Sequence, residues 1–151
     1  MKNYYLQIQQ YLERLIHHIL LLEKKGVGIN GEVFSLVDLF LIRELGTHGE
    51  KKMLQVMEDL GLDRNTFAGI VNRLQGQRLI LKKKSGEDKR VQLLRLTEKG
   101  QEAFGALQLQ EKELLSHILQ DSTFNEEKAI LKFLVKLDML NRNQGNSEAT
   151  Q

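Results

Sequence analysis

The stretch that decides the fold is DRNTFAGIVNRLQGQRLILKKKSGEDKRVQLLRLTEKG, residues 63–100. Asp63 is a side chain suited to capping a helix start. The apolar residues that follow recur at the spacing of one helix face: Phe67, Ile70, Val71 and Leu74. Residues 79–83 and 91–97 have strand character, and SGED between them contains a turn glycine. The stretch therefore predicts a helix followed by a β-hairpin.

Positive charge is concentrated in this stretch. Residues 64–100 contain ten Lys and Arg against three acidic residues, a balance of +7 in a chain whose total is only +2, so the remaining residues sum to −5. The ten are Arg64, Arg73, Arg78, Lys82, Lys83, Lys84, Lys89, Arg90, Arg95 and Lys99. Such sorting is typical of a surface that binds a polyanion.

The rest of the chain reads as helices separated by glycine or polar turns, without cysteine or proline. Helical spacing predicts helices over residues 3–25, 35–45, 51–60, 98–120 and 123–141, with capping boxes at Ser35–Asp38 and Thr123–Glu126 and helix ends at Gly26 and Gly46. The last helix is expected to bury Ile130, Phe133, Leu134, Leu137 and Leu140. Residues 142–151 are polar, which predicts an unstructured tail.

This order predicts a mainly α fold with a small β-hairpin wing, a winged helix-turn-helix plus a helical layer, in a single domain over residues 1–151. The DNA-binding region is expected at residues 33–100. The helices at residues 3–25 and 98–141 carry more apolar surface than a core of this size covers, which favours a second copy of the chain as their partner.

The motifs make the chain similar to the MarR family of transcription regulators. Asp88-Lys89-Arg90 resembles that family's Asp-x-Arg wing element, and Leu96-Thr97-Glu98-Lys99-Gly100 resembles its Leu-Thr-x-x-Gly ending. Leu60-Gly61-Leu62-Asp63 and Asn72-Arg73-Leu74 resemble its recognition-helix entry and its Asp-Arg-Leu. The resemblance implies a homodimeric repressor that leaves a pseudo-palindromic operator when a small apolar or aromatic effector binds. Asn72, Ala68-Gly69 and Lys51-Lys52 depart from the family pattern, which predicts fewer base contacts.

Double-stranded DNA is the partner these residues predict. Near the recognition-helix start, Arg64, Asn65 and Thr66 can meet base edges and phosphates, while Gly69 permits close approach and Arg73 lies further along. Arg90 at the hairpin tip suits a narrow minor groove, with Asp88 orienting it. Phosphate contacts are assigned to the lysines of the hairpin: Lys82, Lys83, Lys84 and Lys89.

Other functions have weaker support. No nucleophile stands beside a His and an acid, and no glycine-rich loop joins a strand to a helix, so we expect no enzyme and no cofactor. His17, His18, His48 and His117 have no metal-ligand spacing, so core or surface roles are favoured and no metal site is assigned, with metal sensing as the weaker alternative. Tyr4, Tyr5, Tyr11 and Phe34 are candidates either for an effector cavity or for ordinary packing. We expect a cytoplasmic protein, and the rival hypothesis is a winged-helix dimer that binds a protein partner.

Overall fold

The computed structural model describes residues 3–148, and the side chains of residues 3–145. Its elements, in chain order, are α1 (Tyr4–Lys25), β1 (Val27–Ile29), β2 (Glu32–Phe34), α2 (Leu36–His48), β3 (Lys51–Lys52), α3 (Met53–Asp59), α4 (Arg64–Gly76), β4 (Ile80–Lys84), β5 (Gln92–Leu96), α5 (Glu98–Leu119) and α6 (Phe124–Glu148). The chain divides into two compact units, residues 1–109 and 110–151. The predicted fold class, mainly helical with a small hairpin wing, is confirmed.

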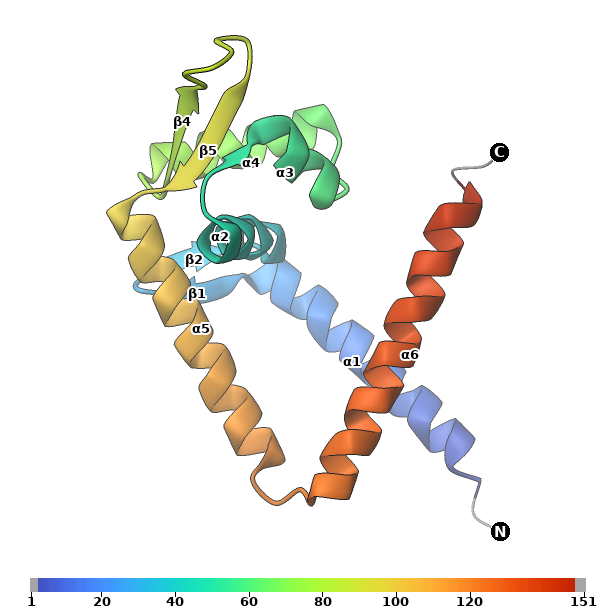
Figure 1. Ribbon diagram of the computed structural model, residues 1–151. Coiled ribbons are helices and arrows are strands. Elements are labelled where there is room, and N and C mark those ends of the chain that lie inside the picture. Colours follow the sequence, from blue (N-terminus) through green and yellow to red (C-terminus); the bar gives the residue numbers. More distant parts are fainter. Residues whose placement is uncertain (1–2, 149–151) are drawn as a thin grey trace. The chain divides into compact units, whose positions relative to one another are not determined.

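The wing is part of a three-stranded antiparallel sheet in the order β3-β5-β4 (Figure 1). Lys51 pairs with Leu94 and Lys52 with Leu93, so these two lysines are extended and not helical. The prediction of one helix over residues 51–60 was therefore wrong at its start. The reason is that β5 has a second edge whose backbone groups need partners, and β3 supplies them. The Lys51 ammonium is also held by Glu44 at 2.6 Å and by Asp59 at 2.7 Å.

Most helix ends lie where capping chemistry places them. The Ser35 side chain accepts a bond from the Asp38 amide and the Asp38 carboxylate accepts one from the Ser35 amide, which confirms the predicted capping box of α2. The same reciprocal bonds join Thr123 and Glu126 at the start of α6. Gly26 ends α1 with a φ of 84°. Local side-chain chemistry therefore fixes these boundaries.

Gly46 does not end α2, which was predicted to stop there. The helix continues to His48 and ends at Gly49, whose φ is 77°. A Cβ at Gly46 would lie 2.4 Å from the Phe104 ring of α5. Gly46 is therefore required for the close packing of two helices, and it is not a terminator.

The last helix also extends further than predicted, to Glu148 instead of residue 141. The predicted tail over 142–151 is therefore helical as far as 148, and residues 149–151 lie outside the described residues. Extending an existing helix adds one backbone hydrogen bond per residue without a new nucleation cost, so a polar segment free of proline can continue it.

A second hairpin, β1–β2, was read from the sequence only as a turn. Val27 pairs with Phe34 and Ile29 with Glu32, and the two loop residues Asn30 and Gly31 both have positive φ, 51° and 81°. Asn-Gly between short apolar strands is the composition that such a two-residue turn requires. The signal was thus present in the sequence.

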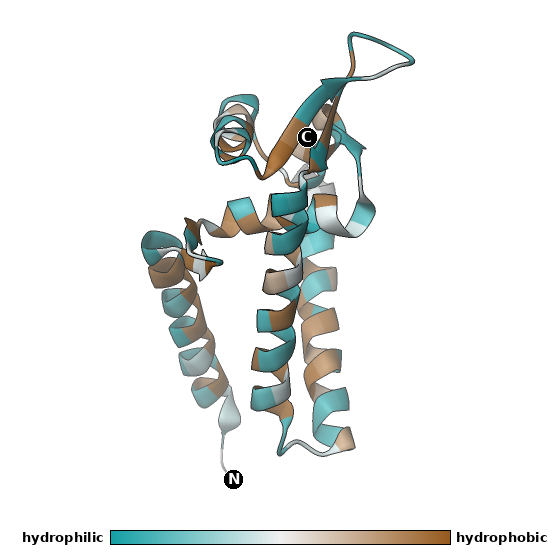
Figure 2. Cartoon of the chain, turned by 90° about the vertical axis from the view of Figure 1, so that its left-hand side faces the viewer, coloured by the Kyte–Doolittle hydropathy of each residue, from teal (hydrophilic) through white to brown (hydrophobic). Residues whose placement is uncertain are grey.

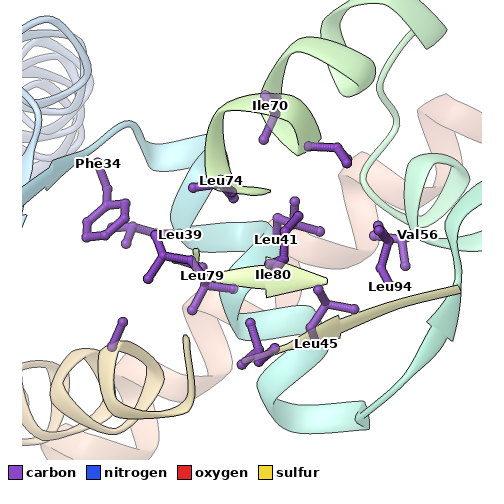
Figure 3. Packing of buried hydrophobic residues seen from close by; sticks show 14 of the residues in the cluster. Phe34, Leu39, Leu41, Leu45, Val56, Ile70, Leu74, Leu79, Ile80 and Leu94 are labelled. Carbon is purple, nitrogen blue, oxygen red and sulfur yellow. The ribbon is translucent and has the colours of Figure 1, made fainter. Parts of the chain in front are cut away.

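A single hydrophobic core holds the wing and α4 in place. Figure 3 shows Leu41 and Leu45 of α2, Ile70 and Leu74 of α4, and Ile80 and Leu94 of the sheet pointing toward one another. Leu41, Leu45, Leu74, Ile80 and Leu94 are all 0% exposed. Close packing of this kind fixes the position of α4 relative to the sheet.

The Leu96–Gly100 segment locks α5 to the start of the wing. The Thr97 hydroxyl donates to the Arg78 carbonyl at 2.6 Å and accepts from the Gly100 amide at 3.0 Å. A Cβ on Gly100 would lie 2.1 Å from the Leu79 carbonyl oxygen. Thr97 and Gly100 therefore fix the connection between β5 and α5 against the residues that precede β4.

No described side chain of α1 or α6 belongs to the core. Among the described residues α1 has no buried side chain. The α6 residues predicted to be buried remain exposed within this chain: Ile130, Phe133, Leu134, Leu137 and Leu140 are 38% to 56% exposed. Figure 2 shows hydrophobic residues recurring along the helix that begins at the N-terminus. The predicted apolar periodicity is present, and a second copy of the chain as the partner that covers it stays a prediction.

Candidate nucleic-acid interface

Helix α4 buries one side and leaves the other open. Phe67, Ile70, Val71 and Leu74 are buried, whereas the opposite side is polar or small. A Cβ at Gly69 would meet no atom within 4 Å. The outer surface of α4 therefore has room for the backbone of a ligand to approach.

The N-terminus of α4 is organised by Asp63. Its carboxylate accepts the Thr66 amide at 2.9 Å and the Thr66 hydroxyl at 2.6 Å. These bonds, the hydroxyl bond first, hold the pKa of Asp63 below its usual 3.8. The hydroxyl hydrogen of Thr66 is committed to this cap, so Thr66 can offer a base only its oxygen lone pairs and its methyl group.

The wing presents its cations on strand β4 and on the loop that follows. Lys82, Lys83 and Lys84 pair with Leu94, Leu93 and Gln92 of β5, and all three lysine side chains are exposed. The loop over residues 85–91 closes the hairpin. Lysines on an exposed strand can reach phosphates but carry no geometric selectivity of their own.

Arg90 is held in place by Asp88. The Asp88 carboxylate accepts the Arg90 backbone amide at 3.0 Å and the guanidinium Nε at 3.2 Å, while the Arg90 side chain is 91% exposed. The Arg90 amide first, and then its guanidinium, keeps the pKa of Asp88 below its usual value. The wing arginine is thus oriented and yet open to solvent.

A groove of about 650 Å³ joins these elements. It brings Arg64 of α4 together with Lys82 and Arg90 of the wing, above a largely apolar floor. Its lining comprises Lys52, Met53, Leu54, Gln55, Met57, Glu58, Arg64, Phe67, Ala68, Lys82, Arg90, Val91 and Gln92. In Figure 1, α3, α4 and the wing lie side by side in this part of the molecule. Cations of α4, β3, β4 and the hairpin loop therefore line one groove, together with Glu58 of α3.

Two of the predicted site residues are paired with acids that lie outside the stretch 63–100. Lys83 is paired with Glu50 at 2.9 Å, and Arg73 is paired with Asp38 of α2. Arg64 and Arg73 are nine residues apart, which places them about 180° apart around the helix. The structure therefore separates Arg73 from the groove that holds Arg64. Lys84, Lys89 and Asn65 are exposed outside that lining.

Sequence reasoning missed Lys52 and Asp38. Lys52 lines the groove because it lies on β3, and the segment had been read as helix. Asp38 was identified as a capping residue, but its partnership with an arginine 35 positions along the chain has no local signature.

Other kinds of site find no support in the described part of the chain. Among the side chains of residues 3–145, no group of three or more His, Asp or Glu could hold a metal ion. No described helix has the length and apolar content needed to cross a membrane. Phe34 is 1% exposed and belongs to the core, so it does not line an open effector cavity, while Tyr4, Tyr5 and Tyr11 are 60% or more exposed.

Comparison with known proteins gives a structural match but no sequence match. No protein-family model matches the chain, and no curated protein matches it. Among solved structures, it is similar to Streptococcus pneumoniae FabT in complex with DNA, with a TM-score of 0.81 and 22% identity over 93% of this chain and 99% of that one. It is also similar to the Streptomyces coelicolor regulator PcaV in complex with its natural ligand, at 0.64 and 22% over 91% and 96%.

A third match is Lactococcus lactis ZitR, described as a zinc-responsive MarR family member, with a TM-score of 0.60 and 20% identity over 87% of this chain and 97% of that one. These three structures span nearly the whole of both chains. The fold is therefore a winged helix-turn-helix with flanking helices. In particular, it is the fold of the MarR-type transcriptional regulators.

Proposed function

We propose that this chain is a MarR-type transcriptional regulator that binds double-stranded DNA as a homodimer. The observation that carries the proposal is the groove in which Arg64 of α4 meets Lys82 and Arg90 of the wing. The open outer side of α4 would enter a major groove, and Arg90 would reach the adjacent minor groove, where the potential is most negative. The match to a DNA-bound FabT of the same fold supports this reading.

Repression is the mode of action that this arrangement favours. A dimer would place two copies of α4 on successive turns of a pseudo-palindromic duplex and so occlude a promoter. A small apolar or aromatic effector that changes the distance between the two copies would release it. PcaV was solved with its natural ligand, which supports an effector for the fold. We place the protein in the cytoplasm.

The salt dependence of binding tests the proposal. A labelled duplex from the DNA upstream of the coding region, and a mixed-sequence duplex of the same length, are titrated with protein at several salt concentrations. The logarithm of the affinity should fall linearly with the logarithm of salt, with a slope near −0.9 per phosphate neutralised. A flat line would overturn DNA binding and favour a protein partner.

Arg90→Ala sharpens the test because it removes a wing arginine whose side chain is 91% exposed. Affinity should fall about tenfold or more, since a hydrogen bond to a charged group contributes roughly 1.5–3 kcal/mol. Arg142→Ala is the matched control, because Arg142 is also exposed, at 77%, and is paired with an acid, Asp138, but lies outside the wing. Equal affinities for the two variants would remove the wing from the mechanism.

The homodimer is supported by the exposed apolar side chains of α1 and α6. Ile16 and Leu20 lie one turn apart on α1 and are 58% and 64% exposed. Ile16→Lys with Leu20→Lys should shift the protein to monomer in analytical ultracentrifugation. Gln7→Lys with Gln10→Lys adds the same charge to the same helix, away from the face that carries Ile16 and Leu20, and should leave the dimer intact. A wild-type monomer at all concentrations would contradict the dimer.

A further inference from the structure

The ion pair between Asp38 and Arg73 involves the one charged residue that is buried among those described. Asp38 is 3% exposed, and both of its carboxylate oxygens are bonded. Oδ2 accepts the Ser35 amide at 2.9 Å, and Oδ1 accepts Nη2 of Arg73. A buried carboxylate needs such partners, so Asp38 is fixed by the cap on one side and by Arg73 on the other.

The contact with Asp38 uses only part of the hydrogen-bonding capacity of Arg73. A guanidinium has five N–H donors in a planar fork, and the bond to Asp38 uses one of them. The Arg73 side chain is 48% exposed, while that of Asp38 is 4% exposed. Arg73 is therefore anchored at one edge and presents its other donors to solvent.

The surface around Arg73 is open. Gly69, Arg73 and Gly76 follow each other at spacings of four and three, which places them on one strip of α4. A Cβ at Gly69 or at Gly76 would meet nothing within 4 Å. Nothing in the described chain therefore blocks a bulky backbone from reaching the guanidinium along this strip.

The width of the DNA major groove indicates which part of a duplex this strip of α4 would meet. A helix with its side chains is about 10–12 Å across, and the major groove is about 12 Å wide, so both flanks of an inserted helix lie close to phosphates. Arg64 is on the flank that faces the wing. Arg73 is on the opposite flank, about 180° away.

We propose that Arg73 binds a phosphate of the strand opposite the wing and that Asp38 is the positioning residue that orients it. This inference rests on the proposed DNA-binding function and assigns a second point of contact to it. A guanidinium that is already oriented loses less side-chain entropy on binding. The affinity for DNA is therefore higher, although no contact is added. Asp38 touches no DNA itself.

The experiment compares salt slopes for duplex binding by the full-length protein. Asp38→Asn keeps an oxygen that can accept the Ser35 amide but gives Arg73 no carboxylate. Its affinity should fall about two- to tenfold, the effect of ordering one long side chain on binding. Its slope should match the wild type, because Arg73 keeps its charge and can still reach the phosphate.

Asp38→Asn combined with Arg73→Gln removes both charges, so no buried carboxylate is left unpaired. Its slope should be shallower than that of Asp38→Asn by about 0.9, the contribution of one phosphate. A purely structural pair would shift the melting temperature but leave the slope alone. Arg73→Lys should keep the wild-type slope with weaker binding, and Arg142→Gln should change neither slope nor affinity.

The outcomes separate this inference from the proposed function. Equal slopes for the single and the double Asp38 variants, with the wild type binding normally, would overturn the phosphate contact alone. Wild-type affinity in Asp38→Asn would overturn the positioning role. A wild-type protein that binds no duplex would overturn both this inference and the proposed function.

Discussion

The winged region and the helices α1 and α6 have similar amphipathic sequences, but the apolar side chains are buried in the first and exposed in the second. Leu41 and Leu45 of α2 are 0% exposed, whereas Leu20 of α1 and Leu131 of α6 are 64% and 62% exposed. Complete burial of a leucine contributes about 1.5–3 kcal/mol, and an exposed leucine contributes little until something covers it. Helical periodicity thus predicts that a face is apolar, but it does not say which molecule covers that face.

Helix α5 contains both buried and exposed apolar residues. Its N-terminal half buries Gly100, Ala103 and Leu107, whereas Leu109, Leu114, Leu115 and Ile118 further along are 56% to 60% exposed. The boundary between the two compact units also falls at residues 109 and 110. The described part of the chain therefore contains one hydrophobic core and a set of apolar side chains that this core does not cover.

The largest effect should come from truncating the complete core. Phe67→Ala removes a ring that is 1% exposed and should lower the free energy of unfolding by about 3–5 kcal/mol, because it leaves a cavity. Chemical denaturation measures this change. Phe124→Ala is the matched control at 78% exposure, and it should change stability by only about 0.5 kcal/mol at low protein concentration.

Repeating the Phe124→Ala measurement at high protein concentration sharpens the contrast. If a second copy covers α6, the loss should grow with concentration, because association stabilises the folded state by mass action. A large loss at every concentration would mean that Phe124 is already packed within the chain, and the contrast between the two regions would fail.

Two glycines of α5 test where the core ends along that helix. Gly100→Ala should destabilise the protein by about 1–3 kcal/mol, since its Cβ would lie 2.1 Å from the Leu79 carbonyl oxygen, which is backbone and cannot move aside. Gly105→Ala has open space and should stabilise the helix by about 0.5–1 kcal/mol. Thermal melting of the two variants should therefore give shifts of opposite sign.

A smaller effect, that of Gly69→Ala, distinguishes the exposed side of α4 from the exposed apolar faces of α1 and α6. The open side of α4 has small residues where α1 and α6 have large apolar ones. Gly69→Ala should raise stability by about 0.5–1 kcal/mol, like Gly105→Ala. Only Gly69→Ala should weaken duplex binding, because its methyl group projects into the space left for DNA. Unchanged affinity would show that this part of α4 does not approach the duplex closely.

Much of the winged region was predictable because its signals are local. Asp63 caps α4, Ser35 and Asp38 cap α2, and Gly26 ends α1, as their side chains and spacing indicated. The Asn-Gly turn between β1 and β2 was an equally local signal that was read too cautiously.

The errors share a different cause, which is contact between distant residues. Gly46 was read as a terminator because its partner, Phe104, is far away in the sequence. Lys51 and Lys52 are extended because β5, which follows some 40 positions later, has an edge to fill. No local pattern carries this information.

The candidate site was predicted as a set of cations, but not how those cations are divided. Arg64, Lys82 and Arg90 share one groove, as expected for residues of one surface. Arg73 is bonded to Asp38 and Lys83 to Glu50, and neither acid belongs to the basic stretch. Sequence shows which charges are present, and only the fold shows which of them are already paired.

The smallest expected effect is a change in the acid sensitivity of α4. The pKa of Asp63 is lowered below 3.8 by its bonds to Thr66, so its charged form stabilises the fold above that pH, and the contribution is lost as the pH falls below it. Asp63→Asn keeps a good N-cap without a titrating group. At neutral pH its melting temperature should be close to that of the wild type, and below pH 3.8 it should fall less steeply. Parallel acid profiles for the two proteins would show that the cap adds no stability through its charge, and that the core alone holds the start of α4.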